Sequence, residues 1–144
     1  MIRRATVLDL SALLLMLNNM HKETEIKVPD INSYKLVSNV NRILHEGIVL
    51  VATEDNKLTG SIGGCTTTDW WASEKYLADS WFYVYPDNRK SDIAKNLITD
   101  FIKIGKEANM KVRLGHIFSG DLDRKDKFYE RLGLVKAGST YVEA

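Results

Sequence analysis

The first part of the chain has the periodicity of helices. After a short expected strand at residues 2–5, the leucines of residues 8–20 recur at i, i+3, i+4 and i+7, which predicts a half-buried helix. These leucines are Leu10, Leu13, Leu14 and Leu17. Thr6 can cap this helix, and Asp9 falls in its first turn, where the helix dipole favours a carboxylate.

A second helix follows a polar segment at residues 22–29. It is expected to begin at Asn32 or Ser33 and to end at His45, because Gly47 then stops the pattern. Its predicted buried side chains are Tyr34, Val37, Val40 and Leu44.

The middle of the chain predicts three consecutive strands. Residues 48–52 form a continuous, largely β-branched run, which is typical of a buried strand. A polar turn at residues 54–57 then returns the chain along residues 58–67, as a hairpin. The third strand covers residues 77–85, is rich in aromatic side chains, and is closed by Pro86.

The last third of the chain returns to helical periodicity, starting at Ile93. Its apolar stripe runs over four turns through Ala94, Leu97, Ile98, Phe101, Ile102 and Ala108. Residues 110–118 alternate as a strand, Asp123 is expected to cap a short helix that ends at Leu132, and residues 134–142 are expected to form a last strand.

The resulting order of elements is β-α-α-β-β-β-α-β-α-β. An antiparallel meander followed by β-α-β predicts an α/β protein of the α+β kind, with a mixed sheet covered by helices on both faces. We expect one domain over residues 1–144, because this length can bury a sufficient core without disulfides or a structural metal.

Composition narrows the class of protein. The formal net charge of +1 argues against nucleic-acid binding by bulk charge. Every apolar run in the sequence is much shorter than the roughly 18 residues that a membrane-spanning helix needs, so no membrane association is expected. The single cysteine, Cys65, cannot form an internal disulfide, which fits a reducing, cytoplasmic compartment. His21, His45 and His116 lack ligand-like spacing, so no metal site is predicted.

The boundary between the third strand and the long helix carries a recognisable segment. Residues 84–94, Val-Tyr-Pro-Asp-Asn-Arg-Lys-Ser-Asp-Ile-Ala, resemble the cofactor-binding segment of the GNAT superfamily of N-acetyltransferases. The pattern of that superfamily is Gln/Arg-x-x-Gly-x-Gly/Ala between a strand and a helix. Arg89 and Ala94 match this pattern, and Asp92 replaces its first glycine.

Two further segments support the resemblance. Residues 128–134, Phe-Tyr-Glu-Arg-Leu-Gly-Leu, are similar to the Phe-Tyr-x-x-x-Gly-Phe pattern at the end of the superfamily's last helix. Arg-Ala-Thr at residues 4–6, followed by Asp9, is similar to its opening strand and helix. The order of elements agrees over the whole chain, which indicates the superfamily without indicating a substrate.

The resemblance implies that acetyl-CoA is the co-substrate. Its binding residues would be Val84, Tyr85, Arg89, Lys90, Ser91, Asp92, Ile93 and Ala94. A helix N-terminus offers unpaired N–H groups and partial positive charge to a pyrophosphate. Without the resemblance, the same segment reads as an N-cap at Ser91 beside a solvated loop. Asp92 leaves two alternatives open: its side chain faces solvent while the backbone still binds, or coenzyme A binding is lost.

The resemblance also implies the roles in catalysis. The acceptor amine would attack the thioester directly, and the backbone N–H near Val84 would stabilise the oxyanion. Tyr129 matches the tyrosine that protonates the departing thiolate, a transfer about 1.5 pKa units, or about 2 kcal/mol, uphill at ordinary values. Asp79, expected on the same face of its strand as Trp81, could accept the ammonium proton through water. Asp79 as a turn residue, with no dedicated base, is the alternative.

The resemblance also implies an acceptor site at the first two helices and at the loop that precedes residues 77–85. Glu23, Trp70 and Trp71 are the predicted acceptor-binding residues, and the tryptophans either stack on substrate or cover a core edge. The acceptor would be an amine-bearing small molecule, peptide or protein. A non-catalytic interaction module that binds coenzyme A weakly or not at all is the alternative function. Since 11 residues follow Gly133, another chain could complete the sheet edge in a homodimer.

Overall fold

The structure is a computed structural model that describes residues 1–115 and 121–143. The strands are β1 (Ile2–Arg4), β2 (Ile48–Glu54), β3 (Lys57–Thr68), β4 (Lys75–Val84) and β5 (Lys111–Arg113). The helices are α1 (Leu10–Lys22), α2 (Ser33–Glu46), α3 (Ile93–Glu107) and α4 (Leu122–Arg131), with 3-10 turns at Val7–Asp9 and Pro86–Asn88. None of the helices in the described ranges is long and apolar enough to cross a bilayer.

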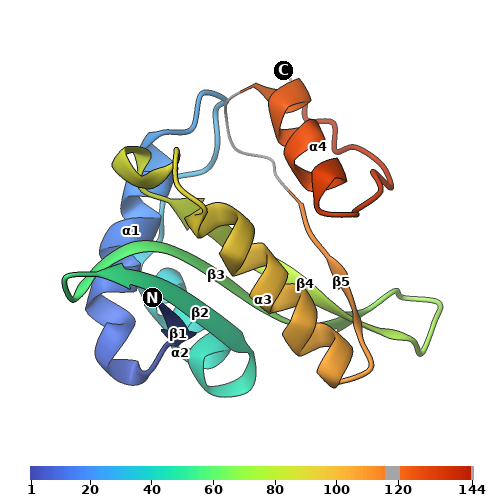
Figure 1. Cartoon of the computed structure of the whole chain (residues 1–144), viewed down its shortest axis with the longest axis horizontal. Helices are drawn as coiled ribbons and strands as arrows, with labels where there is room; N and C mark the ends of the chain where they lie inside the picture. The colour runs from blue at the N-terminus through green and yellow to red at the C-terminus, as the bar shows by residue number, and fades with distance from the viewer. Residues whose placement is uncertain (116–120, 144) are drawn as a thin grey trace.

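The five strands form one mixed sheet in the order β1-β2-β3-β4-β5. The first four are antiparallel neighbours, and β5 lies parallel to β4. Helix α3 crosses one face of the sheet, and α1 and α2 cover the other (Figure 1). This arrangement confirms the mixed α/β fold that the order of elements predicts.

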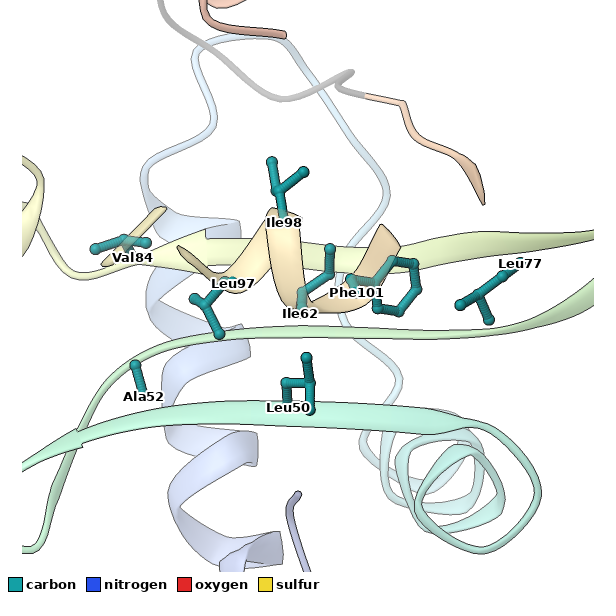
Figure 2. Close-up of a cluster of buried hydrophobic side chains, with 8 residues drawn as sticks. All are labelled: Leu50, Ala52, Ile62, Leu77, Val84, Leu97, Ile98 and Phe101. Atoms are coloured by element: carbon teal, nitrogen blue, oxygen red, sulfur yellow. The ribbon is translucent and has the colours of Figure 1, made fainter. Parts of the chain in front are cut away.

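The core on the α3 side is built from the predicted helical stripe. Leu97, Ile98 and Phe101 are fully buried and pack on strand residues such as Leu50 and Ile62. Figure 2 shows eight side chains of this cluster, contributed by the sheet and by α3. Because such buried side chains resist displacement, this cluster fixes the start of α3 against the end of β4.

A β-bulge interrupts β4. Gly63 faces Trp81 and Gly64 faces Asp79, so Ser80 is an extra residue in β4. Side-chain alternation therefore changes there, and Asp79 lies on the opposite face of the strand from Trp81. The expectation that the two share a face was wrong, because strict alternation holds only without a bulge.

The predicted cap at Thr6 closes the 3-10 turn Val7–Asp9, which leads into α1 at Leu10. The Thr6 hydroxyl accepts a hydrogen bond from the Leu8 N–H at 3.2 Å, and the Asp9 carboxylate accepts one from the Thr6 N–H at 2.8 Å. Asp9 also receives two hydrogen bonds from the Arg3 guanidinium, each 2.8 Å long. This pairing ties β1 to the beginning of α1.

Two details of the other helices differ from expectation. In α2, Tyr34 is 93% exposed and Val37 is 41% exposed, while the buried residues are Val40 and Ile43. The first buried residue, Val40, thus lies six residues, nearly two turns, after the predicted Tyr34. Helix α4 is capped by Asp121, whose carboxylate accepts from the Arg124 N–H at 3.2 Å, so Asp123 lies inside the first turn and is not the cap.

The C-terminal strands are shorter than predicted. Of the strand expected over residues 110–118, β5 covers Lys111–Arg113, and positions 116–120 lie outside the described residues. The strand expected over residues 134–142 was wrong, since residues 134–143 have no regular secondary structure. Val135 and Tyr141 are about nine-tenths exposed, so this segment lacks the packed face that stabilises a strand. Completion of the sheet by a second chain stays a prediction, which the mass in light scattering would test.

Candidate active site

A cleft of about 810 Å³ lies along β4, between the end of α1 and helix α4. We call it the β4 cleft. In the described part of the chain, β5 pairs with β4 only at Tyr76, Leu77 and Ala78, just before the bulge. Beyond that point, none of the described residues pairs with β4 on the side away from β3. The predicted site residues that line the cleft are Glu23, Asp79, Val84, Arg89, Ala94 and Tyr129.

The backbone of Val84 faces the side of β4 that lies away from β3. The Tyr85 N–H donates to the Thr59 carbonyl of β3 at 2.9 Å, and Val84 is the next residue along the strand. Backbone groups of successive residues in an antiparallel pair point to alternate sides. The Val84 N–H and carbonyl therefore point away from β3, and Arg89 Nε donates to that carbonyl at 2.8 Å. This leaves the Val84 N–H directed into the cleft as a hydrogen-bond donor.

Asp79 and Tyr129 lie at the same part of the cleft. The Gly115 N–H donates to Asp79 Oδ1 at 3.0 Å, but burial outweighs this bond and raises the pKa of Asp79 to about 6. Burial, and then the charge of Asp79, raise the pKa of the Tyr129 phenol above its ordinary value. The charge of Asp79 therefore acts on the Tyr129 hydroxyl, and both side chains line the cleft.

Aromatic contacts hold α4 over β4. The ring of Phe128 stacks on that of Phe82 with centroids 6.4 Å apart, and it meets Tyr129 edge to face at 5.5 Å. These contacts orient Tyr129 toward the cleft, which both helix and strand line. Both Phe128 and Tyr129 are partly buried and pack against the core on the α3 side of the sheet, and the role of Tyr129 as the acid stays a prediction.

Glu23 belongs to a charged network at the other end of the cleft. The Tyr83 hydroxyl donates to one Glu23 oxygen, and Arg89 donates to the other at 2.7 Å. The Arg89 guanidinium also lies over the Tyr83 ring, 5.3 Å from its centroid. Burial raises the pKa of the Glu23 carboxyl, but the hydrogen bonds from Tyr83 and Arg89 outweigh it, so the net pKa is lowered. Glu23 is therefore a charged group that joins the end of α1 to the end of β4.

The start of α3 adjoins the cleft at Ala94. Asp92, not Ser91, occupies the N-cap position, and its exposed side chain makes no capping hydrogen bond to the described residues. The Ser91 hydroxyl donates to the Asn88 carbonyl at 2.6 Å and accepts from the Ile93 N–H at 3.4 Å. The first N–H groups of a helix have no intrahelical acceptor, so this terminus can bind an anion.

Several predicted residues lie outside the lining of the β4 cleft. They are Trp70, Trp71, Tyr85, Lys90, Ser91, Asp92 and Ile93. Trp70 is 91% and Trp71 is 68% exposed in the loop between β3 and β4, with their ring centroids 5.5 Å apart. The base of that loop is held by Arg113, which pairs with Asp69 at 2.8 Å. The structure does not bring the two tryptophans together with the other site residues.

Sequence reasoning missed several residues that line the cleft. Tyr83, Gly115, Arg124 and Lys125 are among them. Burial and the nearby Arg89 charge lower the pKa of Lys125, which shows how close α4 comes to the end of β4. The dense basic run at residues 124–127 was the available signal, because α4 carries Arg124 and Lys125 into the site. Within the described ranges, His, Cys, Asp and Glu do not gather in groups of three or more that could hold a metal ion.

Comparison with known proteins identifies the family of this chain. A family model described as "Acetyltransferase (GNAT) domain" matches residues 45–135. No curated protein matches the chain in sequence.

Solved structures with the same fold span the whole chain. An aminoglycoside antibiotic 6'-N-acetyltransferase from Acinetobacter haemolyticus is 15% identical, with a TM-score of 0.76, and the match covers 100% of this chain and 97% of that one. A predicted acetyltransferase with acetyl-CoA from Clostridium acetobutylicum is 19% identical, with a TM-score of 0.78 and coverage of 100% and 94%. A ribosomal-protein-alanine N-acetyltransferase from Brucella melitensis biovar Abortus 2308 is 20% identical, with a TM-score of 0.70 and coverage of 100% and 99%. At these identities the likeness shows the fold.

Proposed function

The chain belongs to the GNAT acetyltransferase family, and from this premise we propose that it is a single-domain N-acetyltransferase that moves the acetyl group of acetyl-CoA to an amine. The observation that carries the proposal is the β4 cleft, where the Val84 backbone points away from β3 and where Asp79 and Tyr129 both line the wall. The cleft thus combines a hydrogen-bond donor, a base and an acid, which is the set that acyl transfer between a thioester and an amine needs.

Acetyl-CoA fits the groups that this end of the sheet offers. Its pyrophosphate would bind the N–H groups of residues 91–94, around the start of α3, with Lys90 and Arg89 as nearby cations. There it would replace the Asn88 carbonyl and the Ser91 hydroxyl, which accept from the Ser91 and Ile93 N–H groups. Tyr85 and Ile93 would shape the backbone on either side of that site. A cleft of about 810 Å³ leaves room for the pantetheine arm and an acceptor together. The solved structure from Clostridium acetobutylicum contains acetyl-CoA, according to its description, which supports the same co-substrate here.

The proposed reaction begins at Asp79. With a pKa of about 6, this carboxyl is ionised at neutral pH and accepts a proton from the acceptor ammonium, directly or through water. The neutral amine nitrogen then bonds to the thioester carbonyl carbon, and the Val84 N–H stabilises the oxyanion that forms. Collapse of this intermediate breaks the carbon–sulfur bond, so coenzyme A departs as a thiolate. The nitrogen, which carries an extra proton after its attack, gives that proton to water as the neutral amide forms.

Tyr129 would donate a proton to that thiolate. Burial and the Asp79 charge raise the pKa of Tyr129. Proton transfer from the phenol to the thiolate therefore costs more than the roughly 2 kcal/mol that ordinary pKa values give. Asp79 carries the acceptor's proton by this stage, which removes the charge that opposes ionisation of the phenol. The two groups therefore work in sequence, first the base and then the acid.

The acceptor would be an amine-bearing small molecule, peptide or protein. The descriptions of the similar structures name an aminoglycoside and a ribosomal-protein alanine as acetylated groups, and both carry amines. Trp70 and Trp71 would contact only an acceptor that extends beyond the β4 cleft, such as a peptide or protein, because they lie outside its lining. Glu23 lies inside the lining and would contact an acceptor of any size.

A thermal-shift measurement tests the proposal. A ligand that binds the folded state raises the melting temperature by mass action, so acetyl-CoA is expected to raise it in the micromolar to millimolar range. An acceptor panel with acetyl-CoA should then include an aminoglycoside, a polyamine, free amino acids and peptides ending in alanine or containing lysine. No shift at millimolar acetyl-CoA would contradict the proposal and favour a non-catalytic interaction module.

A further inference from the structure

Both oxygens of the Glu23 carboxylate are engaged by residues at the end of β4. One accepts from the Tyr83 hydroxyl, and the other accepts from Arg89 at 2.7 Å. Arg89 in turn has its Nε on the Val84 carbonyl and its guanidinium over the Tyr83 ring. Arg89 therefore neutralises the carboxylate that lines the cleft where an amine acceptor would enter.

Arg89 also lies four residues before the start of α3, where the pyrophosphate of acetyl-CoA would bind. An anion at that helix terminus competes with Glu23 for the guanidinium. A phosphate oxygen is a strong acceptor for a guanidinium, and bidentate binding adds to its advantage. The Arg89 and Glu23 side chains are 47% and 35% exposed, so their ion pair is of the weak, partly solvated kind that a ligand can displace.

We propose that Glu23 binds the ammonium group of the acceptor, and that Arg89 blocks it in the cofactor-free protein and releases it when the phosphates of acyl-CoA bind. This inference rests on the proposed function. Tyr83 keeps its hydrogen bond to Glu23 in both states and so holds the carboxylate at the cleft wall. The released oxygen then accepts a hydrogen bond from the ammonium group.

The exchange couples the two substrates. Acyl-CoA raises the affinity for the amine because it removes the competing cation from Glu23. By linkage, an amine bound at Glu23 raises the affinity for acyl-CoA by the same factor. Glu23 thus binds the acceptor only after Arg89 has moved to the phosphates of acyl-CoA.

Calorimetric titration with acetyl-CoA tests the exchange in four proteins: wild type, Glu23→Gln, Arg89→Gln and the double variant. Glu23→Gln frees Arg89 for the phosphates, so it is expected to tighten acetyl-CoA binding by about two- to fivefold, the range of a partly exposed ion pair. Arg89→Gln is expected to weaken binding. In the Arg89→Gln background, Glu23→Gln is expected to have no further effect, because its action passes through Arg89.

The double variant separates this exchange from simple charge repulsion. If the Glu23 charge repelled the phosphates through space, Glu23→Gln would tighten binding equally with and without Arg89, and the inference would be wrong. Glu25→Gln is the matched control, since Glu25 lines the same cleft and its charge acts on Lys125. A gain for Glu25→Gln as large as for Glu23→Gln would also overturn the inference. Unchanged or weaker binding in Glu23→Gln would overturn it directly.

Steady-state kinetics tests the acceptor side, with the amine of the panel that wild type acetylates fastest. Glu23→Gln is expected to raise the KM of that amine and to lower the KM of acetyl-CoA. A general loosening of the cleft would raise both values, and this result would contradict the inference. Absence of acetyl-CoA binding to wild type, or of turnover with every amine, would instead overturn the proposed function and the inference with it. Thermal denaturation of each variant verifies that it is folded.

Discussion

Gly63 lies directly against the indole ring of Trp81, so closely that a Cβ on this glycine would fall 2.2 Å from the ring atom Cζ2. The ring is held in that position by its Nε1, which donates to the Ser61 hydroxyl at 3.0 Å, and Ser61 donates to the Leu50 carbonyl at 2.8 Å. The bulge that places Asp79 begins at the next residue, Gly64. The missing side chain of Gly63 is therefore part of what positions the active site.

Replacing Gly63 with alanine should destabilise the protein. The added methyl group displaces a ring that is fixed by a buried hydrogen bond, and such overpacking costs about 1–3 kcal/mol in the free energy of unfolding. Chemical denaturation would measure this loss. Gly138→Ala is the control and should be neutral, since a Cβ at Gly138 meets nothing within 4 Å. Equal free energies of unfolding for the two variants would contradict this prediction, since the Trp81 ring would then move aside without loss of stability.

Asp79 should control the pH dependence of the reaction. Its pKa of about 6 predicts that kcat rises as pH increases through this value, because only the ionised carboxylate accepts the acceptor's proton. Asp79→Asn should lower kcat by about 10²- to 10⁴-fold, the usual contribution of a general base, and remove this limb of the pH profile. A pH–rate profile that keeps its acidic limb in Asp79→Asn would assign the base to another group.

The same substitution should make the protein more stable at neutral pH. The folded-state pKa of Asp79 is raised above that of the unfolded chain, so the favourable contribution of its protonated form is present below about pH 4 and is lost as pH rises through 6. Asn preserves an acceptor for the Gly115 N–H without the buried charge. Asp79→Asn should therefore gain on the order of 3 kcal/mol at pH 7 and almost nothing at pH 4. An equal difference at both pH values would contradict the raised pKa.

How far the sequence predicts this protein depends on how local each feature is. The α3 stripe and the hairpin of β2 and β3 follow from spacing within one segment, and both agree with the structure. The bulge at Ser80 does not, because it arises from the contact between β4 and the glycines of β3. The sequence thus identified Asp79 as a candidate base, but the prediction of the face of β4 on which its side chain lies was wrong.

In the candidate site, too, local features were predicted from the sequence and contacts between distant residues were not. Arg89 and Tyr129 were found from motifs that lie within one segment each. The bond between Glu23 and Tyr83 joins residues 60 positions apart, and no local pattern records it. The last predicted strand failed for a related reason, since residues 134–142 alone cannot supply the neighbouring strand that a sheet requires.

Tyr129→Phe should separate acid catalysis from packing. The substitution keeps the ring that meets Phe128 edge to face and removes only the hydroxyl. We expect kcat to fall on the order of 10²-fold, with the affinity for acetyl-CoA unchanged in calorimetry. Tyr76→Phe is the control, because the Tyr76 ring packs under Arg113, 4.0 Å from the guanidinium carbon, and does not line the cleft. Full activity of Tyr129→Phe would exclude the phenol as the acid.

Asp92→Gly should tighten the binding of acetyl-CoA. Asp92 is the N-cap of α3, with φ of −82° and ψ of 5°, so its backbone does not require glycine and already has a conformation that any residue adopts. Its carboxylate is nevertheless a like charge beside the proposed pyrophosphate, and its side chain adds bulk where glycine would allow close approach.

Asp92→Asn divides these two effects in the same calorimetric titration. Asn removes the charge and keeps the bulk, so an equal gain for Asn and Gly would assign the effect to charge, and a larger gain for Gly would assign the remainder to close approach. Asp87→Asn is the matched control, because it removes an exposed carboxylate from the same loop, five residues earlier. Unchanged or weaker binding in Asp92→Gly would contradict the placement of the pyrophosphate at the start of α3, since a binding anion must respond to the charge at that terminus.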